Sequence, residues 1–482
     1  MPMKMKLNRA EIQDKILGCW IGKNIGGTIG GPFEGREDIL DVQGFSSPKG
    51  EPLPNDDLDL QLVWLRAMEY VGPKALDANV LAEYWLGYIA PDFNEYGTGK
   101  TNLRMGLLPP LSGEVNNELW HHSNGAWIRS EVWACMAPGI PNIAVKYAIA
   151  DGRIDHGLAE GTRAEIFTAA LESLAFFETD IRTVIEKALK YIPEESRVAR
   201  SVRIVLNGYD NGEDWKKVRN AVVEDCSDLG WFMAPENIAF TVLGLVYGEG
   251  DFKKSMLYAV NCGDDTDCTA GTCGSILGIM FGAKNIPEDW KEYIGDDIKT
   301  ICINGAYRSC VAKTCTELTQ RVMAQIPVVL QAYGIEVEMA ECESSLGDVK
   351  PDEILKDYAE EVFKRSPYSF EVKSVPHTNA VVEYERPSII KEGEDFKVKV
   401  SFRNWRRNPL YYDMDVKLPE GWSAEYSKTV FAIHDSIKGI GEGFWEMTIH
   451  VGEEVEAINR INVTAWPRGN ATPVFIPVVL LG

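Results

Sequence analysis

Three carboxylates lie within four positions of the segment 259–271, AVNCGDDTDCTAG, and form the most chemically informative stretch of the chain. Carboxylates this close repel one another and raise each other's pKa, so a fold that keeps them together supplies a cation or exposes them to water. Asp265 and Asp267, two positions apart at the entrance of a predicted helix, can point into one site, and Mg²⁺ prefers such oxygen ligands. Helix capping by Asp and Thr is the alternative reading of this segment alone.

A second acidic cluster, PNDDLD at 54–59, stands before an apolar helical pattern. Asn55 is a suitable N-cap, which places Asp56 and Asp57 in the first helical turn. A favourable interaction with the helix dipole is the alternative explanation, worth about 0.3–1 kcal/mol for each carboxylate. Two such clusters far apart in the sequence predict one shared site for two hard divalent cations, about 3.5–4 Å apart.

Regularly spaced glycines occur in the helices that carry or precede these clusters. They recur every four residues at Gly18, Gly22, Gly26 and Gly30, and again at Gly274, Gly278 and Gly282. Such spacing presents a smooth stripe to a close neighbour, so the two helices could pack tightly and bring the distant acidic turns together. The pairs at 26–27 and 30–31 could equally mark a helix end followed by a loop.

Hydrophobic periodicity divides the chain. Between about 10 and 340 apolar residues recur every three or four positions, which predicts ten or more helices and an all-α orthogonal helical domain over 1–340. A further predicted helix, 353–365, belongs to a helical linker over 341–370. Beyond it the pattern alternates with period two, as in 396–402 and 445–451, which predicts a C-terminal β-sandwich over 371–482.

Composition excludes several classes of function. The chain of 482 residues has 49 Lys+Arg against 72 Asp+Glu, a net charge of −23, so binding to nucleic acid is disfavoured. No apolar run has the length of a membrane helix, and no signal-peptide pattern follows the first eight residues. Ten scattered cysteines without a CxxC pair predict buried free thiols and a cytoplasmic protein. The oligomeric state stays open.

Three blocks together resemble the ADP-ribosylglycohydrolases, all-α enzymes that use two Mg²⁺ or Mn²⁺ ions. GGTIGGPFE at 26–34 is similar to the family's GDALGxPxE, NDD at 55–57 to its [ST]DD, and GDDTDCT at 263–269 to its GGDTDT. Between them, SNGA at 123–126 with Arg129 resembles the family's GNGAAMR block. The similarity covers about 11–335 and implies that the predicted helical domain is the catalytic one.

The resemblance implies a set of metal ligands: Asn55, Asp56, Asp57, Asp265, Asp267 and Cys268. Asn55 stands where the family has Thr or Ser, and Gly27 where it has Asp. Cys268 takes the place of a hydroxyl ligand and offers a soft sulfur that suits Mg²⁺ poorly. Whether that ligand is lost, or replaced by water or by Asp264, is left open.

The resemblance also implies catalytic and substrate-binding residues. Glu34 stands where the family places the glutamate that approaches the scissile ribose, and Asp57 and Asp265 complete the catalytic set. The stretch 91–133 has few helix signals and is predicted as a long binding loop. We expect Tyr96 and Asn124 in that stretch to contact the substrate together with Glu34, and Arg129 could meet hydroxyls or phosphate.

The function implied is metal-dependent hydrolysis of a ribofuranosyl C1–N or C1–O bond, removing ADP-ribose from a protein or small-molecule acceptor. A carbohydrate furanoside or a nucleoside is the alternative substrate, because LPEGW at 418–422 resembles a turn of Ig-like modules that accompany bacterial glycosidases. A second alternative is an inactive ADP-ribose-binding protein of the same fold, motivated by Asn55, Gly27 and Cys268.

Overall fold

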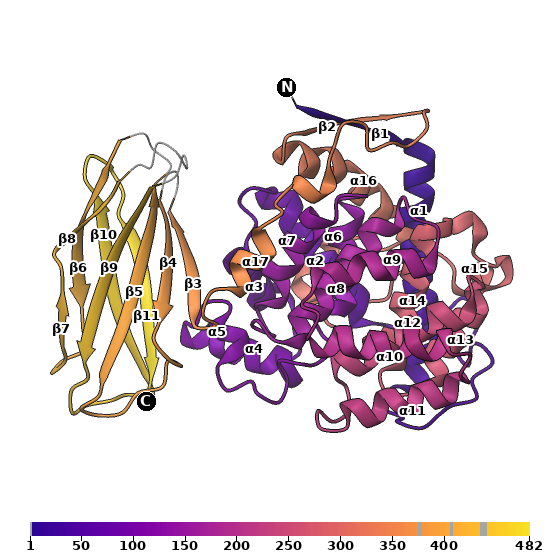
Figure 1. The fold of residues 1–482 in the computed structure, drawn as a ribbon, viewed down its shortest axis with the longest axis horizontal. Helices are drawn as coiled ribbons and strands as arrows, with labels where there is room; N and C mark the ends of the chain where they lie inside the picture. The colour runs from indigo at the N-terminus through magenta and orange to yellow at the C-terminus, as the bar shows by residue number, and fades with distance from the viewer. Residues whose placement is uncertain (1, 375–377, 405–407, 434–440) are drawn as a thin grey trace.

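The computed structural model describes residues 2–374, 378–404, 408–433 and 441–482 (Figure 1). Helices occupy most of the chain up to residue 332, and two antiparallel sheets occupy most of the described residues after 368. Figure 1 shows these two parts side by side, with the sheets packed against the end of the helical part that carries α4 and α5. The predicted helical fold with ten or more helices and the C-terminal sheets are confirmed.

The bounds of the α-helices are α1 (Arg9–Gly30), α2 (Asp56–Val71), α3 (Ala78–Tyr88), α4 (Asn94–Met105), α5 (Leu111–Glu114), α6 (Glu131–Cys135), α7 (Pro141–Gly152), α8 (Glu160–Ala175), α9 (Ile181–Ala188), α10 (Arg197–Asp210), α11 (Trp215–Cys226), α12 (Ala234–Gly248), α13 (Phe252–Asn261), α14 (Thr266–Phe281), α15 (Glu288–Ile294), α16 (Cys315–Ala332) and α17 (Tyr358–Phe363). Side chains that accept from the first-turn N–H groups start many of them: Asn8, Asn55, Asp77, Asp180, Ser196, Asp214, Asp251 and Thr314. Each such cap is worth about 1 kcal/mol relative to alanine.

The two glycine stripes pack against each other, as predicted. A Cβ on Gly22 would lie 2.1 Å from the carbonyl oxygen of Gly274, and one on Gly18 would lie 2.5 Å from that of Gly278. Glycine at these positions therefore lets the backbones of α1 and α14 touch. Gly30, the last residue of α1, lies against Thr266, the first residue of α14. The packing thus places the end of α1 beside the acidic turn at 263–267.

The predicted long binding loop over 91–133 is wrong. The chain there forms α4 and α5, a 3₁₀ turn at Trp127–Arg129 and α6. Helix α4 escaped the periodicity analysis because the side chains that it buries are mostly polar, including Glu95, Lys100 and Asn102. The predicted helix 353–365 is also shorter than expected, since only α17 and a 3₁₀ turn at Pro351–Glu353 form there.

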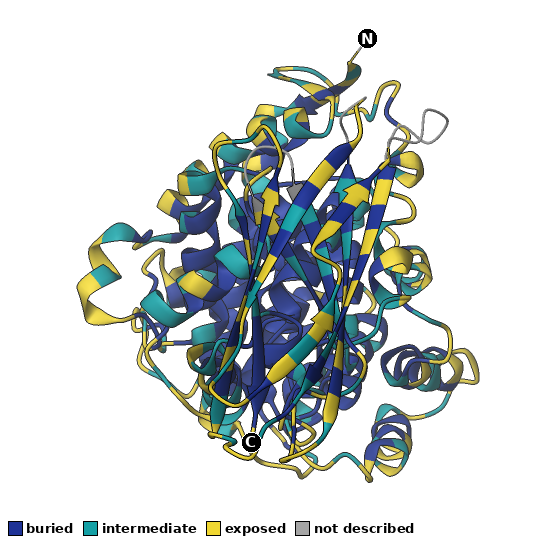
Figure 2. Ribbon diagram, turned by 90° about the vertical axis from the view of Figure 1, so that its left-hand side faces the viewer, coloured by how far each residue is buried: buried dark blue, intermediate teal, exposed yellow. Residues whose placement is uncertain are grey.

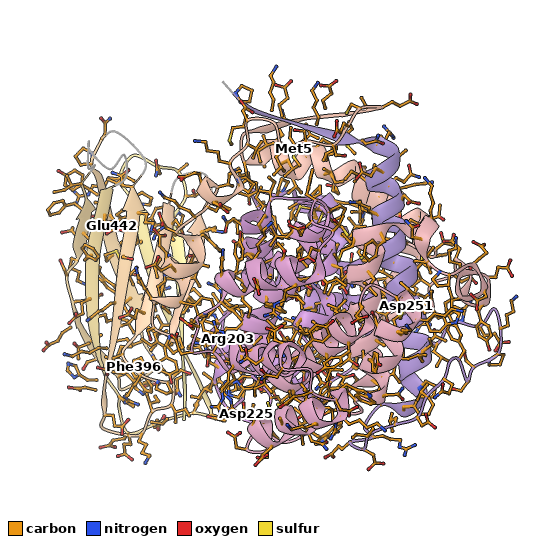
Figure 3. The ribbon with its side chains drawn as sticks, turned by 45° about the vertical axis from the view of Figure 1, so that its right-hand side comes forward. Met5, Arg203, Asp225, Asp251, Phe396 and Glu442 are labelled. Carbon is orange, nitrogen blue, oxygen red and sulfur yellow. The ribbon has the colours of Figure 1, made fainter. Side chains whose placement is uncertain are left out.

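A short parallel pair joins distant parts of the sequence and was not predicted. Strand β1 (Met3–Asn8) runs alongside β2 (Ile335–Ala340), with Met3 opposite Ile335 and Asn8 opposite Ala340. Met5 and Leu7 of β1 are fully buried. Figure 3 labels Met5 on this strand at the edge of the helical part, far from Phe396 and Glu442 on the sheets.

The remaining strands form the two sheets of a sandwich. A five-stranded sheet has the order β3-β4-β5-β9-β7, and a four-stranded sheet has the order β11-β10-β6-β8. Their bounds are β3 (Ser369–Ser374), β4 (Thr378–Tyr384), β5 (Asp395–Asn404), β6 (Leu410–Lys417), β7 (Ser423–Tyr426), β8 (Thr429–Ala432), β9 (Gly441–His450), β10 (Ile458–Pro467) and β11 (Val474–Leu481). Figure 2 shows buried and exposed residues alternating along these strands, as the period-two pattern predicts.

Apolar residues of the helical part complete the core of the sandwich. Leu107, Leu111 and Val115, on and beside α5, are buried in one cluster with Phe396 and the other inward-facing strand residues. Hydrogen bonds cross the same boundary, including one from Asn79 Nδ2 to the carbonyl oxygen of Glu371 at 2.8 Å. The segment that follows α4 therefore contacts the sheets.

Two further expectations concern the whole chain. All ten cysteines are free, eight of them are buried, and the prediction of buried thiols is confirmed. Among the residues that the structure describes, no helix combines the length and apolarity needed to cross a bilayer.

Candidate active site

The two acidic turns converge in the folded chain. One carboxylate oxygen from each of Glu34, Asp265 and Asp267 lies within 4.8 Å of the others, and the same holds for one ligand atom each of Asp57, Asp267 and Cys268. Asp267 belongs to both groups, which we call the outer group (Glu34, Asp265, Asp267) and the inner group (Asp57, Asp267, Cys268). Glu34 is exposed, whereas the other members of both groups are buried.

Backbone hydrogen bonds attach the turn after Glu34 to the acidic turn at 263–267. Gly35 N–H donates to the carbonyl oxygen of Asp264 at 2.9 Å, and Asp264 N–H donates to that of Arg36 at 2.7 Å. Both Gly35 and Asp264 have positive φ, +79° and +62°, which bends the two segments around each other. The Asp264 carboxylate accepts from Phe232 N–H, and it belongs to neither group.

Asp265 and Asp267 each keep one unpaired buried oxygen. Asp265 Oδ2 accepts from Asn124 Nδ2 at 2.7 Å and Asp267 Oδ2 accepts from Asn55 Nδ2 at 3.2 Å. Their Oδ1 atoms have no hydrogen-bond partner among the described residues. Burial and the neighbouring carboxylates raise the pKa of both side chains well above its usual value. A buried carboxylate without donors is costly, so these oxygens call for a cation or a proton.

Glu34 and Asp56 form the solvent side of the cluster. Desolvation, together with the charges of Asp56 and Asp57, raises the pKa of Glu34 to about 7. Burial and the charge of Asp57 raise the pKa of Asp56 to about 6, although Tyr96 O–H donates to Asp56 Oδ2 at 2.9 Å and opposes the shift. A cation beside these groups would lower both pKa values again by favouring the charged forms.

Asp57 is engaged by donors of the protein itself. Its Oδ2 lies 2.9 Å from Lys23 Nζ, and its Oδ1 accepts from Cys268 Sγ at 3.3 Å. Lys23 Nζ also lies 2.9 Å from Glu131 Oε1 and donates to Thr272 Oγ1 at 3.0 Å. Burial lowers the pKa of Lys23, but Asp57 and Glu131 outweigh it and raise that pKa above its ordinary value. Lys23 was not predicted as a site residue, because its only signal in the sequence is a charge between two glycines of the α1 stripe.

Asn55 caps α2 with its side-chain oxygen. Asn55 Oδ1 accepts from Asp57 N–H at 2.7 Å, which fixes the amide so that its nitrogen faces Asp267. In this orientation the amide presents a donor to the cluster. Gly27 makes room for it, because a Cβ at that position would lie 2.3 Å from Asn55 Nδ2. Burial, followed by the charges of Asp265 and Asp267, raises the pKa of Cys268 well above its usual value, so this side chain stays a thiol.

Tyr96 and Asn124 lie behind the carboxylates. Tyr96 is 1% exposed and Asn124 is 0% exposed, and their polar groups are directed at Asp56 and Asp265. Asn124 Oδ1 accepts from Trp127 Nε1 at 3.0 Å, which holds the amide nitrogen toward Asp265. Contact of these two side chains with substrate stays a prediction, and their visible role is to orient the carboxylates.

Arg129, which could have met hydroxyls or phosphate but was not among the favoured substrate contacts, is bound inside the protein. It is fully buried and donates through Nε to Asp151 Oδ1 at 2.9 Å and through Nη2 to Asp155 Oδ1 at 2.8 Å. Its guanidinium lies 4.7 Å from the ring centre of Trp85. Asp155 in turn contacts His156, whose other ring nitrogen lies 3.2 Å from Ser123 Oγ. The block around Arg129 is therefore a buried scaffold under the acidic cluster.

The outer group fits a divalent cation. It offers three carboxylate oxygens in reach of one point, two of them buried and unpaired, next to an exposed glutamate. Oxygen ligands with this charge suit Mg²⁺ or Mn²⁺. The inner group fits less well, since both Asp57 oxygens are engaged and the thiol of Cys268 is a soft donor. The arrangement can concentrate positive charge beside a carboxylate able to take a proton.

Three solved structures have a likeness to this chain. A chain of an ADP-ribosylglycohydrolase-related protein complex has a TM-score of 0.44 and 19% identity, over 66% of this chain and 99% of that one. A FixG-related protein from Vibrio parahaemolyticus has a TM-score of 0.18 and 12% identity, over 22% of this chain and 97% of that one. The GAE domain of GGA2p from Saccharomyces cerevisiae has a TM-score of 0.16 and 19% identity, over 24% of this chain and 96% of that one.

Sequence comparisons are more informative. Among curated proteins, the ADP-ribosylarginine hydrolase Tri1 of Serratia proteamaculans (strain 568) is 42% identical over 45 residues, which is 9% of this chain and 12% of that protein. The chain thus matches about an eighth of that relative's length. The ADP-ribosylglycohydrolase family matches residues 8–324. Because this match includes both acidic turns and covers more than half of the chain, the protein belongs to the ADP-ribosylglycohydrolase family.

Proposed function

We propose that the protein is a cation-dependent hydrolase that cleaves a ribofuranosyl C1–N or C1–O bond and releases ADP-ribose from a protein or small-molecule acceptor. The observation that carries the proposal is the convergence of Glu34, Asp265 and Asp267 within 4.8 Å, with two buried oxygens that lack donors. Family membership supports hydrolysis of ADP-ribose linkages. The acceptor and the cation are the new parts of the proposal.

In this proposal the side chains divide the work. Glu34, the exposed member of the outer group, takes a proton from the attacking water at a carboxylate oxygen as positive charge develops at the ribose C1. Asp265 and Asp267 hold the cation through their unpaired Oδ1 atoms. A divalent cation there supplies positive charge that acidifies water and attracts ribose hydroxyls and phosphate. Tyr96 and Asn124 keep Asp56 and Asp265 in orientation.

An arginine linkage is the first substrate to test. The short match to an ADP-ribosylarginine hydrolase supports it, although the match covers 9% of the chain. Purified full-length protein is incubated with ADP-ribosyl-arginine, ADP-ribosyl-serine and an aryl furanoside, each with Mg²⁺, with Mn²⁺ and with a chelator. We expect free ADP-ribose from at least one of the first two substrates, and no product with the chelator.

The same assay separates the alternatives. Release of product from the furanoside alone would favour a carbohydrate or nucleoside glycosidase. Calorimetric binding of ADP-ribose without turnover of any substrate would favour an inactive binding protein. Glu34→Gln is the matched variant, since it keeps the shape of the side chain but cannot take the proton. We expect it to retain ADP-ribose binding and to lose turnover by about 10²–10⁴-fold.

A further inference from the structure

We infer that the site holds one divalent cation, in the outer group, and that the ammonium group of Lys23 neutralises Asp57 in place of a second cation. The inference rests on the proposed function, because it concerns the cation that the proposed hydrolase uses. It replaces the predicted roles of Asn55, Asp57 and Cys268 as metal ligands with roles inside the protein's own hydrogen-bond network.

Lys23 is built into the cluster as a permanent cation. Its Nζ forms ion pairs with Asp57 and Glu131, each at 2.9 Å, and donates a hydrogen bond to Thr272 Oγ1 at 3.0 Å. The side chain is 1% exposed, so water does not compete for these contacts. Gly271 leaves space for the lysine stem, since a Cβ there would lie 3.2 Å from Lys23 Cδ. The attraction of two carboxylates at this distance offsets part of the cost of burying the ammonium group.

In the inner group, the two Asp57 oxygens already face an ammonium group and a thiol of the protein itself. Lys23 and Cys268 contact the two Asp57 oxygens, and Asn55 Oδ1 is used to cap α2. The donor nitrogen of Asn55 points at Asp267 Oδ2, and a donor pointing inward disfavours a second positive charge nearby. The space that a metal would need on this side therefore holds hydrogens of an ammonium, a thiol and an amide.

The outer group has the opposite character. Asp265 Oδ1 and Asp267 Oδ1 are buried and have no partner among the described residues, and Glu34 brings a third oxygen within 4.8 Å. In this group the protein supplies carboxylates but no cation. The inner and outer groups thus share Asp267 and differ in the source of positive charge, which is Lys23 of the protein in the inner group and a bound cation in the outer group.

The first experiment counts the ions on the unaltered full chain. Equilibrium dialysis against Mn²⁺ followed by elemental analysis should give one Mn²⁺ per chain, and the electron paramagnetic resonance spectrum should show an isolated ion without coupling to a second one. Two bound ions or a coupled spectrum would overturn the inference and leave the proposed hydrolase intact. No bound ion would overturn it as well, and the chelator arm of the turnover assay then tests the proposed function separately.

Single carboxylate variants identify the group that holds the ion. Asp265→Asn should lose the bound Mn²⁺, with at least a tenfold rise in its dissociation constant, whereas Asp57→Asn should change that constant less than threefold. Loss of the ion from Asp57→Asn with retention in Asp265→Asn would overturn the assignment.

A double variant tests the ammonium directly. Lys23→Met with Glu131→Gln removes the lysine together with one of its two carboxylate partners, which leaves Asp57 free without a second buried charge. We expect this variant to bind two Mn²⁺ ions. The control is Lys15→Met on the same helix, whose lysine contacts Glu11 and the Phe176 carbonyl and should leave one ion bound. A folded double variant that still binds one ion would overturn the role of Lys23, and if it does not fold the single variants decide.

Discussion

Two groups of buried carboxylates lie close together in this protein and have opposite surroundings. Around Arg129, all four oxygens of Asp151 and Asp155 accept hydrogen bonds. Those of Asp151 come from the Arg129 guanidinium and from Trp133, and those of Asp155 come from the guanidinium. Asp155 also contacts His156. In the outer group, Asp265 and Asp267 each keep an oxygen that no described donor reaches. All four of these carboxylates are buried, so the two pairs differ in the donors that reach their oxygens and not in burial.

The largest effect should come from removing a charge that has no protein donor. We expect Asp265→Asn to reduce turnover by more than about 100-fold. Residues that only hydrogen-bond to a metal ligand already change activity by about 10–100-fold when mutated, and a ligand itself should matter more. Its thermal stability without cation should be equal to or above that of the unaltered chain, since an unpaired buried charge is removed. Turnover assays and thermal unfolding measure the two effects, and unchanged turnover would remove Asp265 from the site.

For the buried residues around Arg129 we expect a loss of stability in place of a gain. Arg129→Met leaves Asp151 and Asp155 buried without their cation, which should lower the free energy of unfolding by about 3–5 kcal/mol. Urea unfolding followed by circular dichroism measures it. Arg197→Met is the control, because Arg197 pairs with Asp228 near the surface and should cost at most about 1 kcal/mol. Equal losses for the two variants would contradict the distinction drawn here.

Residues that orient the acidic cluster should have a smaller effect. Tyr96→Phe removes the hydroxyl that donates to Asp56, and Asn124→Ala removes the amide that donates to Asp265. We expect each to lower turnover by about 10–100-fold with little change in the helical content. Tyr209→Phe, which loses an exposed contact with Glu249, should leave turnover unchanged. A pure loss of stability, without loss of turnover per folded molecule, would make Tyr96 and Asn124 part of the scaffold.

The smallest effect concerns pH. Asp56 and Glu34 have pKa values of about 6 and 7, above those of an unfolded chain, and those of Asp265 and Asp267 are also raised. Between pH 4 and 7 these groups of the folded, cation-free protein therefore hold protons that the unfolded chain releases, so their contribution to stability falls as pH rises. Saturating Mg²⁺ should then raise the melting temperature by a few degrees more at pH 8 than at pH 5. Equal shifts at both values, or the same difference in Asp265→Asn, would contradict this account.

Periodicity and spacing predicted the framework of the site and missed its internal chemistry. The glycine stripes and the acidic turns indicated that α1, α2 and α14 meet, because such patterns act through backbone contact and helix starts. Helix α4 was missed because it buries polar residues, so no apolar stripe marks it. Lys23 was missed for a related reason. Lysine is usually exposed, and the two carboxylates that hold this one in the interior are distant from it in the sequence, so its burial could not be predicted.

The parallel pairing of β1 with β2 has a consequence for how the protein is made. Strand β1 at 3–8 pairs with β2 at 335–340, so this pair cannot form until residue 340 has left the ribosome. At about 5–20 residues per second this takes tens of seconds, during which the apolar side of β1 has no native neighbour. Nascent chains arrested before that point should be open to proteases and in need of chaperones.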